Sequence, residues 1–150
     1  MKKFIYSMQS ILDIKKKLED QEKTNYGIAR AKEIEEEQKL SALCKRRDKY
    51  EEVLKGKVSG SLNVKEIIEA ENAVEILKTY IKIQKIAVNK ARDDVKFALS
   101  SLMRATAERK VQEKLREKAF NEYKSEYEKE ERKQVDELVS FKYTSENKDD

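Results

Sequence analysis

Histidine, proline and tryptophan are absent from this chain of 150 residues, which has one cysteine and three glycines. Without proline, and with few glycines, little in the chain forces a helix to end. The single cysteine, Cys44, cannot form an internal disulfide or a thiolate zinc site. Without histidine, the usual base for a serine or cysteine nucleophile is missing. The sequence also lacks a glycine-rich phosphate loop, so we expect a protein that is not an enzyme and that binds no metal or cofactor.

Long apolar runs are missing as well. No stretch approaches the roughly 20 residues that a transmembrane helix needs, and the opening residues lack the features of a signal peptide. We therefore expect a cytoplasmic protein without a transmembrane segment. The 34 basic and 30 acidic residues alternate along the chain, and the net charge is +4. Nucleic-acid binders normally gather their basic residues on one face, so no nucleic-acid partner is expected.

The composition favours helices that pair in a narrow seam. The chain is 38% hydrophobic and 43% charged, which is too polar to fill a compact three-dimensional core. A seam between two helices needs only about two or three apolar residues in every seven. The sequence therefore predicts an all-α, elongated fold.

The first half of the chain shows a helical stripe that predicts a helix over about residues 4–54. Lys15, Glu22, Glu33, Glu36 and Arg47 share this face, so the helix needs a partner to cover it. Gly27 costs about 1 kcal/mol inside a helix, and close packing or a bend would explain it. The apolar members of the stripe are Phe4, Met8, Ile11, Leu18, Tyr26, Ala29, Leu40, Leu43, Tyr50 and Leu54.

Residues 55–63 contain two of the three glycines and are the strong turn signal of the chain. Asn63, followed by Glu66, fits a capping box at the start of a second helix over about residues 64–142. The polar residues 144–150 are expected to form a disordered tail.

The second helix has a regular heptad pattern with a single polar member, Gln84. After residue 105 the pattern loosens, because Arg109 and Gln112 fall in the seam while Val111 and Leu115 lie one position away. The seam residues are Ile67, Ala70, Val74, Leu77, Ile81, Gln84, Val88, Ala91, Val95, Ala98, Leu102 and Ala105.

These patterns predict one domain, residues 1–143, that folds as a two-helix antiparallel coiled coil. Folding the chain about residue 59 places Leu18 near Leu102 and Phe4 near Leu115. Because the second helix is longer, residues 116–142 should have no intramolecular partner.

The sequence resembles the flagellar FliJ family of the bacterial type III export apparatus over nearly its whole length. The resemblance lies in Phe4, Leu12, Lys15 and Glu19-Asp20, and in the turn Gly60-Ser61-Leu62-Asn63-Val64 followed by Glu66. It continues in the run ERKVQEKLREKAFNEY and in Asp136-Glu137-Leu138.

The resemblance implies a non-catalytic stalk, similar to the central stalk of a rotary ATPase, at the cytoplasmic side of the inner membrane. Its implied partners are the hexameric flagellar export ATPase, the cytoplasmic domain of the membrane export gate, and export chaperones. The candidate contacts with the ATPase ring are Phe4, Met8, Ile11, Leu115, Ala119, Tyr123 and Tyr127. Those with the export gate are Tyr50, Leu77, Tyr80 and Gln84. A stalk protein of a virulence-type III secretion system and a self-associating structural spacer remain the alternatives.

Overall fold

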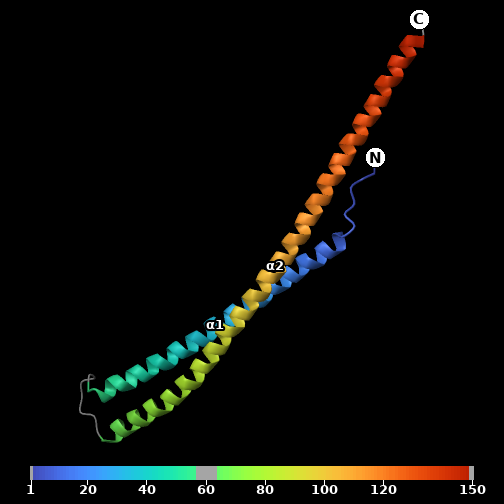
Figure 1. The fold of residues 1–150 in the computed structure, drawn as a ribbon. Helices are drawn as coiled ribbons and strands as arrows, with labels where there is room; N and C mark the ends of the chain where they lie inside the picture. The colour runs from blue at the N-terminus through green and yellow to red at the C-terminus, as the bar shows by residue number, and fades with distance from the viewer. Residues whose placement is uncertain (1, 57–63, 149–150) are drawn as a thin grey trace. The chain divides into compact units, whose positions relative to one another are not determined.

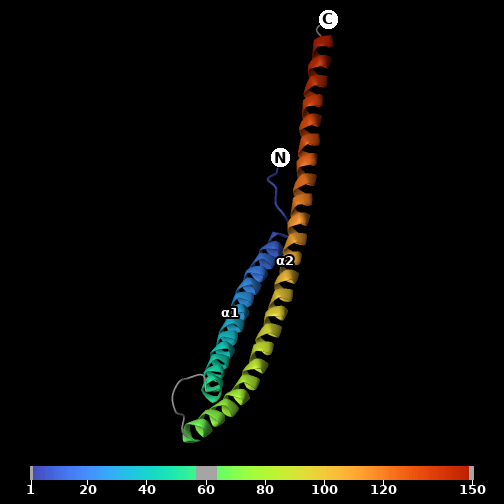
Figure 2. The ribbon, with the colours of Figure 1, turned by 90° about the vertical axis from the view of Figure 1, so that its left-hand side faces the viewer.

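The computed structural model describes residues 2–56 and 64–148, and within them it contains two helices and no strand. Helix α1 runs over Gln9–Leu54 and helix α2 over Val64–Lys148. The two helices lie side by side and run in opposite directions (Figures 1 and 2). The predicted all-α helical hairpin is therefore confirmed.

Contacts within the chain divide it into two units, and each unit contains part of both helices. The first comprises Met1–Glu19 and Ala105–Asp150, and the second comprises Asp20–Arg104. Each unit therefore has its own seam between α1 and α2.

In the second unit, the face of α2 in the seam follows the predicted heptads. Every predicted seam position from Ile67 to Leu102 is buried or half-buried. Alanine alternates with larger side chains in much of this face, which lets the helices approach closely while the larger side chains interdigitate. The most deeply buried members are Ala70, Val74, Leu77, Ile81, Val88, Ala91 and Ala98.

The α1 side of the same seam is more polar. Glu22, Glu33, Glu36 and Arg47 are buried or half-buried there, as their spacing with the apolar stripe predicts. Gly27 was expected to mark close packing or a bend. A Cβ atom at Gly27 would meet nothing within 4 Å, so close packing does not explain this glycine.

In the first unit, α1 presents different residues from those expected. Leu12 and Glu19 are buried, whereas Met8, Ile11 and Leu18 are exposed. Glu19 is buried in place of Leu18 because Arg109 of α2 occupies the seam, as expected. The Arg109 Nε donates to Glu19 Oε2 at 2.8 Å and its Nη1 donates to Glu113 Oε2 at 2.7 Å. These carboxylates raise the pKa of Arg109. A glutamate therefore suits this seam position better than a leucine.

Helix α1 begins at Gln9 rather than near Phe4. The carbonyl of Met8 accepts hydrogen bonds from the amides of Ile11 and Leu12, at 3.0 and 3.1 Å, and these bonds start the helix. Residues 2–6 have no regular structure, and residues 7 and 8 form a turn. Positive charge from Lys2 and Lys3 opposes the helix dipole at an N-terminus, which disfavours an earlier start. We call residues 2–8 the N-terminal strap.

The other helix ends agree more closely with the sequence patterns. Gly56 has a φ of 69°, the left-handed conformation that glycine adopts readily, and its amide donates to the carbonyl of Val53 at 3.1 Å. Asn63, the expected capping residue, lies outside the described residues. Helix α2 continues to Lys148, so the expected tail from residue 144 is helical over residues 144–148.

Val88 provides a test of the second unit's seam. It is only 2% exposed, so Val88→Asp would force a carboxylate among apolar side chains and should lower the free energy of unfolding by about 3 kcal/mol or more. Urea denaturation followed by circular dichroism measures this change. Ile86→Asp is the matched control, because Ile86 is 71% exposed on the same helix. Equal losses for both variants would contradict the seam assignment.

Candidate partner-binding surfaces

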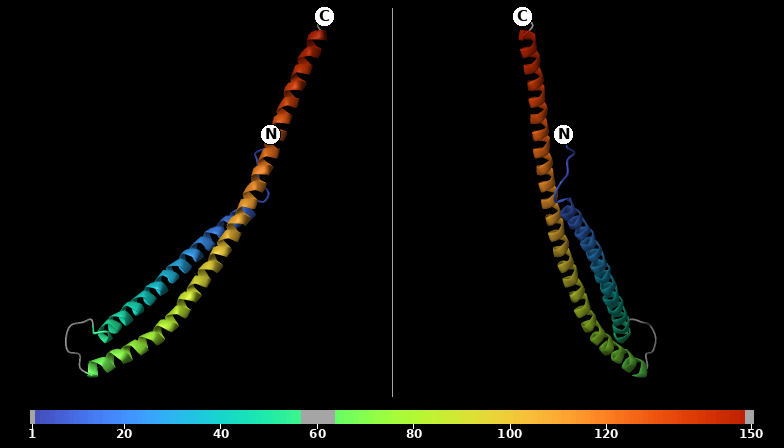
Figure 3. Two further views of the ribbon diagram at one scale, coloured as in Figure 1. Left: turned by 60° about the vertical axis from the view of Figure 1, so that its left-hand side comes forward. Right: turned by 90° about the vertical axis from the view of Figure 1, so that its right-hand side faces the viewer.

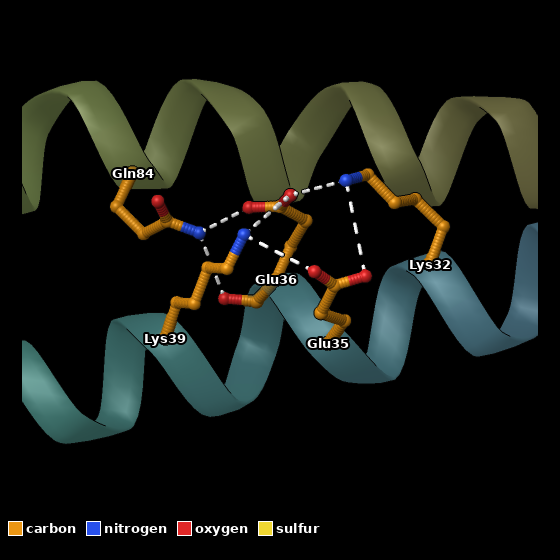
Figure 4. Close-up of polar contacts among 5 residues, drawn as sticks. All are labelled: Lys32, Glu35, Glu36, Lys39 and Gln84. Carbon is orange, nitrogen blue, oxygen red and sulfur yellow. Dashed lines mark hydrogen bonds and ion pairs between the residues drawn. The ribbon is translucent and has the colours of Figure 1, made fainter.

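Gln84, one of the expected gate contacts, is part of a polar layer inside the second unit (Figure 4). Its Nε2 atom donates to the backbone carbonyl of Glu36 at 2.9 Å and also to the Glu36 carboxylate. Glu36 is only 7% exposed. Gln84 therefore joins the two helices, and its amide is already used within the chain.

Two lysines of α1 complete this layer (Figure 4). Lys32 Nζ lies 2.9 Å from Glu36 Oε1, and Lys39 Nζ lies 3.6 Å from the same atom. The hydrogen bond from Lys32, followed by that from Gln84, lowers the pKa of Glu36 to about 2, although burial opposes this shift. The same hydrogen bond is the main cause that raises the pKa of Lys32. Glu36 is thus charged at neutral pH despite its burial.

The other expected gate contacts differ in exposure. Leu77 is 5% exposed and packs in the seam, so its side chain is not presented to a partner. Tyr50 and Tyr80 are exposed on the surface of the second unit. Ile76 and Ile83 are also exposed, and their spacing from Tyr80 places all three on one face of α2. The sequence reading missed these two isoleucines because they fall outside the heptad seam.

The strap packs against α2 in the first unit and brings together two of the expected ring contacts, Phe4 and Tyr123. The ring centroid of Phe4 lies 5.4 Å from that of Tyr123 and 5.3 Å from that of Phe120. The Arg116 guanidinium lies over the Phe4 ring at 5.7 Å. The Tyr123 hydroxyl donates to the carbonyl of Lys2 at 2.6 Å. Aromatic pairs of this kind contribute about 0.5–1.5 kcal/mol each.

This packing corrects the expected pairing of Phe4 with Leu115. Phe4 lies on Phe120 and Tyr123, and Leu115 is exposed. An extended residue advances about 3.3 Å, whereas a helical residue advances about 1.5 Å, so a non-helical strap reaches further along α2. The expectation that residues 116–142 lack an intramolecular partner is therefore wrong for Arg116, Phe120 and Tyr123.

The strap and α2 line a cavity of about 760 Å³ that is open to solvent. Lys2 and Lys3 line its strap side, and Glu122, Glu126 and Glu130 line its α2 side. Opposite charges thus face each other across this cavity. Ala119 and Tyr123, both expected ring contacts, form part of its wall.

Towards the C-terminus, α2 continues well past α1, as Figure 3 shows. All residues of 124–147 are exposed. We call residues 124–147 the exposed end of α2. The ring of Tyr127 lies tilted against that of Tyr123, with the centroids 6.3 Å apart. Negative charge on Glu131 raises the pKa of Tyr127, which keeps the phenol neutral. The other large apolar side chains of this segment are Val135, Leu138, Val139, Phe141 and Tyr143.

Within residues 2–56 and 64–148, no group of three histidine, cysteine, aspartate or glutamate side chains is arranged to hold a metal ion. No helix in that part of the chain is long and apolar enough to cross a membrane. The candidate surfaces are the exposed tyrosines Tyr50 and Tyr80 of the second unit, the strap with its α2 face, and the exposed end of α2.

A pair of long antiparallel helices with heptad seams defines the chain as a two-helix coiled-coil protein. The family model of the flagellar FliJ protein matches residues 4–148. Searches of curated proteins and of solved structures gave no match. The chain belongs to the FliJ family, so it is a component of flagellar protein export, and its family is non-catalytic.

The polar layer predicts a pH dependence of stability. Glu36 has a folded-state pKa of about 2 against an ordinary value of 4.5, so its contribution is fully present above pH 4.5 and is lost as the pH falls through about 2. Glu36→Gln lacks this contribution. The difference in Tm between parent and variant should therefore be largest above pH 5 and should shrink by most of its size near pH 2.

Differential scanning calorimetry at several pH values measures this effect. Glu35→Gln is the matched control, because Glu35 contacts the same two lysines but is half exposed, so solvent screens its ion pairs. A Tm difference between parent and Glu36→Gln that stays constant from pH 6 to pH 2 would contradict the assignment.

Proposed function

We propose that this protein is the coiled-coil stalk of the flagellar export apparatus, which binds the export ATPase ring with the end of α2 and the export gate with the second unit. In this role it promotes ring assembly, assists the cycling of export chaperones, and works at the cytoplasmic side of the inner membrane. The match to a flagellar family model over residues 4–148 favours this role over a stalk of a virulence secretion system.

The observation that carries the ring assignment is the exposure of every residue of 124–147. A helix that continues past its intramolecular partner leaves Tyr127 and Leu138 in water. Burying such side chains against a partner is favourable by roughly 25 cal/mol per Å² of apolar surface. Leu115 is exposed as well, so a ring that surrounds this part of α2 would meet apolar side chains along its length.

The gate assignment relies on Tyr80 and Tyr50. Tyr80 is 54% exposed and shares a face of α2 with Ile76 and Ile83, so this face presents a rigid apolar stripe. Exposed tyrosines are enriched among residues that dominate binding energies. Leu77 and Gln84 would support the stripe from the seam, since neither side chain is free to contact a partner directly.

The ring contact is tested by a double variant, Leu115→Asp with Tyr127→Asp. Both side chains are exposed, so the hairpin should stay folded by circular dichroism. Binding to the purified export ATPase should weaken by about tenfold or more, and stimulation of ATP hydrolysis should fall with it. Phe97→Asp, at an exposed aromatic residue of the second unit, is the control. Full stimulation by the double variant would refute the ring assignment.

The gate contact is tested separately with Tyr80→Asp. Affinity for the isolated cytoplasmic domain of the export gate should drop about tenfold, while ATPase stimulation stays at the parent level. Asn89→Asp adds the same charge at an exposed position on another face of α2 and should change neither measurement. The stripe is not the gate-binding surface if Tyr80→Asp and Asn89→Asp bind the gate domain equally.

A further inference from the structure

The face of α2 under the strap continues the pattern of a coiled-coil seam. Ala105, Arg109 and Gln112 occupy the seam where α1 covers them, and steps of four, three and four lead to Arg116, Ala119 and Tyr123. These residues are arranged to pack against a second helix. In this structure Phe4 of the non-helical strap contacts Arg116 and Tyr123, and Ala119 lines the cavity beside the strap.

The strap fits this face poorly. A cavity of about 760 Å³ between the strap and α2 stays open to solvent. The side chain of Ile5 is 83% exposed, and the buried hydroxyl oxygen of Tyr6 has no hydrogen-bond partner among the described residues. A well-fitting partner would fill the space and satisfy its polar groups.

A small number of contacts attaches the strap. Phe4 packs between Phe120 and Tyr123 under the Arg116 guanidinium, and the Tyr123 hydroxyl bonds to the carbonyl of Lys2. Holding an extended segment in place costs backbone entropy at each residue, which these contacts must offset. The strap is therefore a cover that a better-fitting helix can displace.

We infer that the strap is an autoinhibitory cover, and that an amphipathic helix of the export ATPase displaces it and packs on Ala119 and Tyr123. The charges that line the cavity define the partner's polar edge. Lys2 and Lys3 face Glu122, Glu126 and Glu130 across the cavity, so the incoming helix should carry lysine or arginine there. This inference rests on the proposed ring contact and adds that the strap and the ring compete for one surface.

Competition predicts that weakening the strap strengthens ring binding. Tyr123→Phe keeps the aromatic ring but removes the hydrogen bond to Lys2, and Phe4→Ala removes the main anchor. Each variant should bind the purified ATPase hexamer about threefold to tenfold more tightly than the parent chain. Ile5→Ala is the control and should bind like the parent, because the Ile5 side chain is 83% exposed.

The opposite results would overturn the inference. Weaker binding by Phe4→Ala would show that the strap is itself part of the ring contact. Unchanged binding by both Phe4→Ala and Tyr123→Phe would show that the strap and the ring do not compete.

A distance measurement reports the strap directly. Spin labels are placed at Ile5→Cys and Lys118→Cys in a full-length chain in which Cys44 is replaced by serine, because both labelled positions are exposed. Electron–electron double resonance should give one narrow distance in the free chain and a longer, broad distribution once the hexamer binds. A broad distribution in the free chain, or a narrow one unchanged in the complex, would overturn the inference.

The two hypotheses fail in distinguishable ways. If the hexamer binds the parent chain while the strap stays in place, only the strap inference fails. If the hexamer does not bind the parent chain at all, the proposed ring contact fails and the strap inference falls with it.

Discussion

Two buried carboxylates determine which part of α2 lies against which part of α1. The apolar seam residues repeat every seven positions and are rich in alanine, so a shift by one heptad would still bring apolar side chains together. Glu36 and Glu19 allow no such shift. Glu36 receives a hydrogen bond from Gln84 in one unit, and Glu19 pairs with Arg109 in the other. In any other register Glu36 would lose the hydrogen bond from Gln84 and Glu19 would lose the one from Arg109, which is unfavourable for carboxylates so deeply buried.

The same requirement explains how far sequence reasoning could go. The α2 face from Ile67 to Leu102 was predictable because its side chains are uniformly apolar at regular spacing, and a regular pattern needs no knowledge of the partner helix. The buried residues in the first turns of α1 were not predictable in this way. There the choice between Leu18 and Glu19 as the buried residue depends on Arg109, which is about 90 positions away in the sequence and close only in the fold.

Of the candidate contact residues, some are exposed and others pack inside the chain. Tyr80 and Tyr127, two of the candidate contacts, are exposed, whereas Leu77 and Gln84 serve the seam itself. Phe4 was paired with the wrong part of α2, because periodicity alone made the opening residues look helical and therefore shorter in reach. No local pattern shows that Phe4 meets Phe120, since that contact depends on where α1 begins. Whether these residues bind the export ATPase or the gate remains a prediction.

The exposed end of α2, residues 124–147, affects how the helix unfolds locally. An isolated helix of that length is marginal in water, because most helical stability in proteins comes from packing. This segment avoids the cost of nucleation, since it extends a helix that is already formed at Tyr123. Its backbone amides should therefore open from the C-terminal end inward, with opening free energies that rise from near zero at the tip to the value of the packed hairpin. The helical length of this segment is therefore adjustable, and a partner that binds it determines how many of its turns are formed.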